Sequence, residues 1–233
     1  GRVDVMIFGG IQKTSTIDFP GALSCVLFTR GCNMDCFYCH NRELISFEGD
    51  SLPEADIMSF LLKRRGVLDG VTVSGGEPTL QKGLDDFLRG VKEMGYLVKL
   101  DTNGQKPEKV AGLCWGRLLD YVAVDLKALP GDYCKITGKS GYLAAIETIS
   151  LLKKAEIDFE VRTTLYPGMG IEKLQELMSN LPEMKLWRLN YFRMPIKYRQ
   201  EDKSWLEQKS LTPMAIEDAL PGLLKLQPNL VWK

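Results

Sequence analysis

The strict alternation of strand-like and helix-like segments is the feature that most constrains the fold of this 233-residue chain. Six short, β-rich apolar segments are each followed by an amphipathic stretch, in which apolar residues such as Leu84, Leu88 and Val91 recur at helical spacing. The expected strands are Leu23–Thr29, Val71–Ser74, Leu97–Asp101, Tyr121–Asp125, Phe159–Leu165 and Leu186–Phe192. This alternation predicts a parallel sheet with helical crossovers, and six units are too few for a closed eightfold barrel. We therefore expect an α/β fold, a partial (βα)6 TIM-like barrel that is open on one side.

The length of the chain is that of one domain, and we expect a single domain over residues 1–233. Its core should occupy about 22–192, with an extended arm at 1–21 and a tail at 193–233. In the tail, Pro213 can open a helix, but Pro221 would break it. Ser51 and Glu54 have the spacing of a capping box, which predicts that a helix begins there.

Polar residues gather where the expected strands end. The clusters after the second to fifth strands are Ser74–Pro78, Asp101–Gly104, Asp125–Lys127 and Arg162–Thr164, and the first strand leads directly into a cysteine-rich loop. The carboxyl ends of parallel strands share one rim, where active sites of α/β folds are built. Each cluster alone also fits an ordinary turn. Their common position predicts a functional site at that rim.

Cys32, Cys36 and Cys39 form the cysteine-rich loop with the spacing Cys-x3-Cys-x2-Cys. Three thiolates leave one position of a metal centre open, as catalytic metal sites do. Covalent haem attachment at Cys36–His40 and a thioredoxin-like pair would both leave Cys32 unused. Zinc is a further alternative, but the neighbours Cys39 and His40 can hardly both reach one tetrahedral ion, and the chain has no other histidine. The fourth interpretation, a 4Fe–4S cluster with one iron that lacks a cysteine, uses all three thiols.

The composition of the chain indicates the compartment in which it works and the partners that it does not bind. Lys and Arg number 30, as do Asp and Glu, so no global field favours nucleic acid or an anionic membrane. No apolar run has the length of a membrane span, and no signal-peptide pattern is seen. Cys25, Cys114 and Cys134 are scattered without the plan of a disulfide framework. We expect a reduced, cytoplasmic protein that binds neither nucleic acid nor membrane.

The cysteine spacing, with the aromatic Tyr38 before the last cysteine, resembles the signature of the radical S-adenosylmethionine (radical SAM) superfamily. The Gly-Gly-Glu motif at 75–77 and the expected partial barrel continue that resemblance. Within the superfamily, four segments resemble anaerobic ribonucleoside-triphosphate reductase activating proteins, which are relatives of the pyruvate formate-lyase activating enzymes. These segments are Lys13–Gly21, Phe28–Asn33, Tyr38–Asn41 and Arg162–Gly168.

The resemblance implies the cofactors and their ligands. A 4Fe–4S cluster would be held by the catalytic, metal-ligating Cys32, Cys36 and Cys39, and its fourth iron would bind SAM and cleave it reductively to a 5′-deoxyadenosyl radical. The residues expected to bind SAM are Tyr38, His40, Gly75, Gly76, Glu77, Asp101, Asn103, Asp125, Lys127 and Arg162. Glu77 would accept from the methionyl ammonium group, Asp101 and Asn103 would meet the ribose, and Lys127 and Arg162 would counter the carboxylate. Some relatives have a histidine near the sixth strand, where this chain has Asn190, Tyr191 and Phe192.

The resemblance also implies a partner. The radical would be installed on a backbone glycine of an anaerobic ribonucleotide reductase, with electrons from a low-potential donor such as flavodoxin or ferredoxin. The mixed-charge stretch Arg193–Lys203 could dock that partner or be a solvated loop. One alternative is a radical SAM enzyme with a small-molecule substrate, such as a deazapurine synthase-like enzyme. Another is an electron-transfer or structural metal protein.

Overall fold

The computed structural model describes residues 5–232, and within them it contains an eight-stranded sheet in the order β1 to β8. The strands are β1 (Phe8–Ser15), β2 (Ser24–Thr29), β3 (Gly70–Gly75), β4 (Leu97–Thr102), β5 (Tyr121–Asp125), β6 (Asp158–Leu165), β7 (Trp187–Tyr191) and β8 (Leu230–Trp232). The α-helices are α1 (Glu54–Lys63), α2 (Leu84–Glu93), α3 (Pro107–Trp115), α4 (Tyr133–Thr137), α5 (Tyr142–Lys154), α6 (Ile171–Ser179), α7 (Lys203–Leu206) and α8 (Pro213–Leu226). The first four residues of the expected arm and Lys233 of the tail lie outside the described residues.

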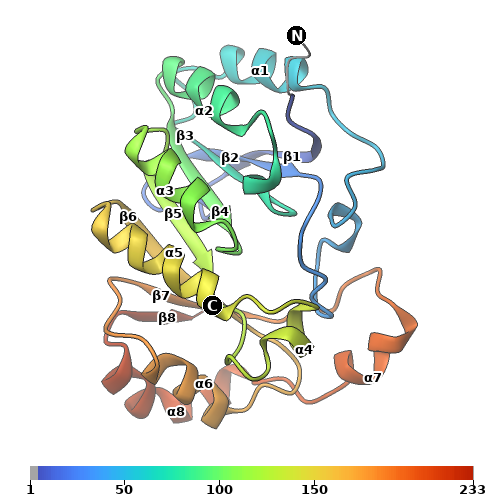
Figure 1. The fold of residues 1–233 in the computed structure, drawn as a ribbon, viewed down its shortest axis with the longest axis vertical. Helices are drawn as coiled ribbons and strands as arrows, with labels where there is room; N and C mark the ends of the chain where they lie inside the picture. The colour runs from blue at the N-terminus through green and yellow to red at the C-terminus, as the bar shows by residue number, and fades with distance from the viewer. Residues whose placement is uncertain (1–4, 233) are drawn as a thin grey trace.

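The sheet has the predicted parallel order. Neighbouring strands from β2 to β8 pair in parallel, and β1 pairs with β2 antiparallel, as the expected arm or hairpin would. The sheet does not close, because β1 and β8 are its two ends. Figure 1 shows α2, α3 and α5 along the outer side of the sheet, and α6 and α8 near β7 and β8. The predicted partial barrel, open on one side, is confirmed.

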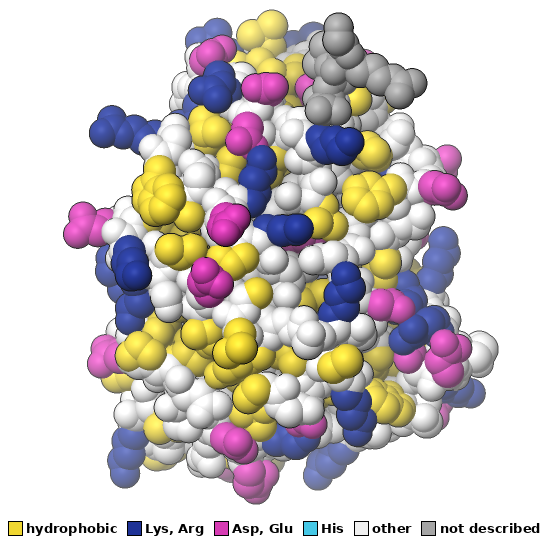
Figure 2. Space-filling view, viewed as in Figure 1, with side chains coloured by type: hydrophobic (Ala, Val, Ile, Leu, Met, Phe, Trp, Pro, Cys, Tyr) yellow, Lys and Arg dark blue, Asp and Glu magenta, His cyan; other side chains and the backbone are white. Residues whose placement is uncertain are grey.

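A buried apolar core fixes the strands in place. Val71 and Val73 of β3 and Val122 and Val124 of β5 are completely buried, as β-branched residues in parallel strands commonly are. On the surface, Lys and Arg side chains are intermixed with Asp and Glu over the face drawn in Figure 2. No helix in the described part of the chain has the length and apolar character needed to cross a membrane.

The predicted capping box is wrong. Pro53, with φ −59° and ψ 136°, occupies the N-cap of α1, and no side chain caps that helix end. The Glu54 carboxylate instead accepts a hydrogen bond from the backbone N–H of Met6, at 2.6 Å. The Glu54 carboxylate, which a capping box would have used at the helix end, is therefore bound to the backbone of the arm instead.

The prediction that Pro221 breaks the tail helix is also wrong. Pro221 lies inside α8, which continues to Leu226. The helix is capped by Thr212, whose hydroxyl accepts from the Ala215 N–H at 3.2 Å. Ile216 and Leu223 are completely buried, so packing outweighs the lost backbone hydrogen bond. The chain then forms β8, a strand that the sequence analysis did not predict.

Candidate functional site

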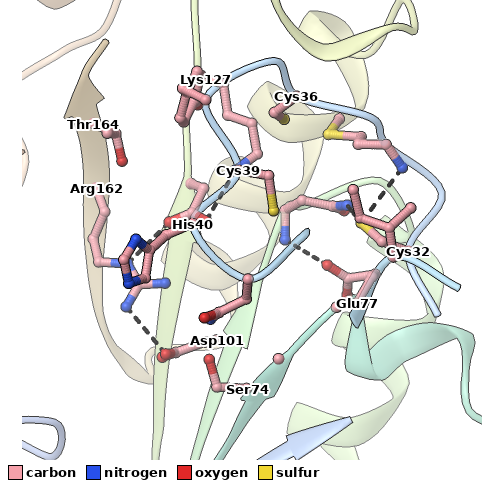
Figure 3. Close-up of a pocket in the computed structure, with 18 of the residues that line it drawn as sticks. Cys32, Cys36, Cys39, His40, Ser74, Glu77, Asp101, Lys127, Arg162 and Thr164 are labelled. Carbon is pink, nitrogen blue, oxygen red and sulfur yellow. Dashed lines mark hydrogen bonds and ion pairs between the residues drawn. The ribbon is translucent and has the colours of Figure 1, made fainter. Parts of the chain in front are cut away.

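The carboxyl ends of β2 to β6 surround a cavity of about 330 Å³. Every residue that the sequence analysis expected to bind the cluster or SAM lines it: Cys32, Cys36, Tyr38, Cys39, His40, Gly75, Gly76, Glu77, Asp101, Asn103, Asp125, Lys127 and Arg162. Figure 3 shows the three cysteine side chains on their loop, across from Arg162 and Asp101 on the strands. The volume lies within the range of small-molecule sites. Segments far apart in the sequence thus build one concave site.

The cysteine loop is held by backbone hydrogen bonds on both sides. The N–H of Cys32 donates to the Ile45 carbonyl at 2.9 Å, and the N–H of Asp35 donates to the Thr137 carbonyl at the end of α4, also at 2.9 Å. The buried Arg30 guanidinium donates to the carbonyls of Glu43, Glu48 and Asp50, which fixes the returning segment. The thiols are therefore presented by a well-supported loop.

The three cysteines of the loop line one cavity. Within residues 5–232, no group of three His, Cys, Asp or Glu side chains is arranged to hold one metal ion, although the three thiols line the same cavity. Burial raises the pKa of Cys32 to about 11 and that of Cys36 to about 12. The raised pKa values favour the protonated thiols. Coordination by a metal favours the thiolates instead, because a coordinating thiol is deprotonated.

Gly75 and Gly76 are required by chain packing. Gly75 has φ +111°, and a Cβ there would lie 2.3 Å from the Thr29 nitrogen. A Cβ on Gly76 would lie 2.2 Å from the Gly31 carbonyl oxygen. The two glycines therefore let the end of β3 lie against the start of the cysteine loop. Their expected approach to a methionyl group stays a prediction.

Glu77 is completely buried, and its carboxylate is already hydrogen-bonded within the protein. Oε1 accepts from the Thr79 hydroxyl at 2.6 Å and the Thr102 hydroxyl at 2.7 Å, and Oε2 accepts from the Asn103 N–H at 2.7 Å. Burial raises the pKa of Glu77. Since Oε2 accepts a single bond from the described residues, it keeps a lone pair for another donor.

Five charged side chains form a network, and four of them, Asp101, Asp125, Lys127 and Arg162, line the cavity. Arg162 joins Asp101 at 3.1 Å and Asp125 at 2.9 Å, while Lys99 contacts Asp101 at 2.5 Å and Lys127 contacts Asp125 at 3.2 Å. Burial alone would raise the pKa of Asp101, but Arg162 and Lys99 outweigh it and hold that pKa at about 2. Three cations thus face two carboxylates. Arg162 and Lys127 line the cavity, where they can meet an anionic ligand group, whereas Lys99 is buried outside the cavity lining.

Two tyrosine hydroxyls of the cavity wall have no hydrogen-bond partner among residues 5–232. They belong to Tyr38, whose ring stacks on Tyr166 with centroids 5.5 Å apart, and to Tyr191 at the end of β7. The side-chain nitrogen Nδ2 of Asn103, in contrast, donates to Oδ1 of Asn33 at 2.8 Å and lies 3.9 Å from the Cys32 sulfur. His40 is exposed at the edge of the cavity. Buried hydroxyls are normally hydrogen-bonded, so these two are free to bind polar atoms of a ligand in the cavity.

The structure adds lining residues that the sequence analysis did not assign: Met34, Asn41, Ile45, Ser74, Thr102, Thr164, Tyr191, Phe192 and Arg193. The role of Thr164 could have been predicted from the sequence. Residues two apart in a strand point to the same face, and Arg162 was already expected in the site. Tyr191 and Phe192, at the end of the sixth predicted strand, line the cavity at the position where the sequence analysis noted a histidine in some relatives.

The chain was compared with known proteins. Residues 26–181 match the Radical SAM superfamily. The chain is 34% identical to a candidate glycyl-radical enzyme activating enzyme of Methanocaldococcus jannaschii, over 97% of this chain and 93% of that protein. It is 32% identical to the pyruvate formate-lyase-activating enzyme of Clostridium pasteurianum, over 73% of this chain and 75% of that protein. Identity to a probable GTP 3′,8-cyclase of Saccharolobus solfataricus is 34%, over 53% of this chain and 41% of that protein.

Among solved structures, Streptococcus suis SuiB bound to S-adenosylmethionine superposes with a TM-score of 0.65. The identity is 16%, over 87% of this chain and 48% of the SuiB chain, so this likeness concerns the fold. Enzymes of the matched superfamily use a 4Fe–4S cluster and S-adenosylmethionine as cofactors. A three-cysteine loop beside a cavity lined by Arg162 and Lys127 fits both. By sequence, fold and site, the chain belongs to the radical SAM superfamily.

Proposed function

We propose that this chain is an activating enzyme that installs a glycyl radical on an anaerobic ribonucleotide reductase. One observation carries the proposal: similarity to the M. jannaschii glycyl-radical enzyme activating enzyme extends over nearly the whole of both chains. The reductase as the target is supported by the local sequence segments, such as Phe28–Asn33 and Tyr38–Asn41.

In this proposal, Cys32, Cys36 and Cys39 hold the 4Fe–4S cluster at the cavity wall. When bound, the cluster and S-adenosylmethionine together supply a 5′-deoxyadenosyl radical by one-electron cleavage. The chain's own residues orient the ligand. Arg162 and Lys127 attract the methionyl carboxylate, and the free lone pair of Glu77 Oε2 accepts from the ammonium group.

A polypeptide substrate is consistent with the mouth of the cavity. Thr164, Tyr191, Phe192 and Arg193 line the cavity where the sheet runs from β6 to β7, and the sheet does not close beyond β8. The segment that follows exposes Met194 and Ile196, the latter 91% exposed. An apolar rim with one arginine offers backbone and side-chain contacts to an extended loop of a partner.

The test is anaerobic. The protein, reconstituted with iron and sulfide, is mixed with S-adenosylmethionine, a reductant and a candidate anaerobic ribonucleotide reductase. We expect a glycyl-radical doublet in the electron paramagnetic resonance spectrum and formation of 5′-deoxyadenosine. Cys36→Ala should abolish both, whereas Cys134→Ala, an exposed cysteine away from the cavity, should abolish neither. Cleavage without a doublet across a panel of reductases would contradict the proposal.

A second candidate function is radical chemistry on a small molecule, which the similarity to a probable GTP 3′,8-cyclase favours. That similarity spans about half of this chain and less than half of the cyclase. Turnover of GTP, or of a deazapurine precursor, in the absence of any protein partner would support this second function. The electron donor that we propose for either function is a flavodoxin or a ferredoxin.

A further inference from the structure

A second cavity, of about 510 Å³, also borders the cysteine loop, and its lining includes Asp35, Gly138 and Lys139, which do not line the first cavity. Its lining residues include Cys32, Met34 and Ile45, which also line the first cavity. The loop itself is therefore the wall between the two cavities. A molecule in the outer cavity would contact the loop that carries the metal-binding cysteines without entering the inner cavity.

The outer cavity has more cationic than anionic groups. Arg42 and Lys139 line it, against the single carboxylate of Asp35. The Asp35 carboxylate forms ion pairs with two guanidinium groups, those of Arg42 and of Arg199, the latter at 2.7 Å. Arg199 additionally pairs with Asp202 at 2.8 Å and Glu201 at 3.7 Å, so its charge is balanced. Positive charge that is open to a partner thus comes from the lysines.

Lys135 and Lys139 are exposed and form no ion pair with any residue in the described range 5–232. Lys135 lies in the last turn of α4, and Lys139 follows that helix. The whole chain has a formal net charge of zero, so the positive charge of this surface comes from these two lysines. Exposed, unpaired charges of one sign attract an oppositely charged partner over about a Debye length, ~10 Å at 0.1 M salt.

The surface that carries these lysines is rigidly joined to the cysteine loop. The end of α4 accepts the Asp35 N–H through the Thr137 carbonyl, and a Cβ on Gly138 would lie 3.4 Å from the Asp35 Cβ. Lys135 lies over the ring of Trp205, 4.7 Å from its centroid, and that ring packs on Phe37 at 5.3 Å. Figure 1 shows the blue cysteine loop reaching down to α4, with α7 nearby. A protein bound to the end of α4 would therefore be held close to the metal-binding loop.

We propose that this outer surface, formed by the outer cavity with Lys135 and Lys139, binds the protein that reduces the cluster, and that this protein is a small, acidic one-electron carrier. The inference rests on the proposed radical function, which requires one electron for each cleavage. One electron passes from the reduced carrier to the cluster held by Cys32, Cys36 and Cys39, and the carrier is oxidised by one electron. No bond forms or breaks between the two proteins. The inner cavity stays open to S-adenosylmethionine and the substrate.

The first test measures binding without the cluster. An acidic flavodoxin in its oxidised form is titrated with the cluster-free chain at low ionic strength, and flavin fluorescence reports the Kd. The double variant Lys135→Glu/Lys139→Glu should bind about 10-fold more weakly or worse, and added salt should reduce the difference. The matched control is Lys153→Glu/Lys154→Glu, two exposed lysines in the last turn of α5, just before the start of β6, whereas the cysteine loop follows the end of β2. The control should bind as the unaltered chain does.

The second test compares two reductants in the reconstituted enzyme. The readout is the rate of 5′-deoxyadenosine formation with reduced flavodoxin divided by the rate with dithionite, a small reductant that needs no docking surface. The ratio should fall about 10-fold in the Lys135/Lys139 variant and stay constant in the Lys153/Lys154 control. Unaltered flavodoxin binding, or equal losses with both reductants, would overturn the inference. Neither test uses a reductase, so failure of the glycyl-radical assay would reject the proposed function separately.

Discussion

Asp101 stabilises the fold through its ionised form. Its carboxylate lies between Arg162 and Lys99, which hold its pKa at about 2 against the opposing effect of burial, below the ordinary value of 3.8. A carboxyl pKa that is lowered on folding gives stability that is present above the unfolded pKa and is lost as pH falls through the folded pKa. The relevant window is therefore from about pH 4 down to about pH 2.

We expect Asp101→Asn to lower the free energy of unfolding at pH 7 by about 2 kcal/mol, because each pKa unit corresponds to ~1.4 kcal/mol. The difference from the unaltered protein should shrink between about pH 4 and pH 2, where the native carboxylate takes up its proton. Urea unfolding of the cluster-free protein at a series of pH values measures this. Asp218→Asn, at an exposed position of α8, serves as the control. A difference that is independent of pH would contradict the assignment.

At the residue scale, the sequence predicted which side chains meet but not what they contact. Polar residues at strand ends must share one rim in a parallel sheet, so all the expected site residues line one cavity. The contacts within that cavity depend on distant segments. Glu77 is held by Thr102 and Asn103 of another strand end, and Gly76 faces the backbone of Gly31. Such long-range partners leave no periodic signal in the sequence.

At the element scale, local signals succeeded where burial reinforced them. The strands β2 to β7 and helix α2 combine apolar residues with extensive burial, and they were predicted. The capping box at Ser51 failed because Glu54 contacts Met6, and the break at Pro221 failed because buried residues on one face hold α8 together. The three-residue strand β8 carries too few residues to show an alternating pattern.

Pro221 should weaken α8 even though the helix contains it. Proline lacks the N–H that an interior position donates, and it is several kcal/mol less favourable than alanine in a helix interior. Pro221 is exposed, so Pro221→Ala should create no clash. We expect it to raise the free energy of unfolding by about 1–2 kcal/mol, after allowance for the greater freedom of the unfolded chain. Urea denaturation measures this change. Pro213→Ala, at the first turn where no N–H is needed, should give no such gain.

At the scale of the whole molecule, the tail is part of the sheet and of its packing. β8 pairs with β7, and the Gln227 side chain, which is almost completely buried, connects the end of α8 to the segment after α6. Its amide nitrogen lies within hydrogen-bonding distance of the carbonyls of Met178 and Pro182, each at 3.2 Å, and its carbonyl accepts from the Met184 N–H at 2.9 Å. We therefore propose that tail and core unfold as one cooperative unit.

Gln227→Ala tests this cooperativity, because it leaves the buried Met184 N–H without its acceptor. An unsatisfied buried polar group costs about 1–3 kcal/mol. If tail and core form one unit, native-state hydrogen exchange should show that protection falls by the same free energy in α8 and in the central strands β3 and β5. Asn229→Ala, whose side chain donates to the Met184 carbonyl at 3.1 Å in a less buried position, should lower protection by a smaller amount. Loss of protection confined to α8 and β8 would instead show that the tail opens independently of the rim that holds the cysteine loop.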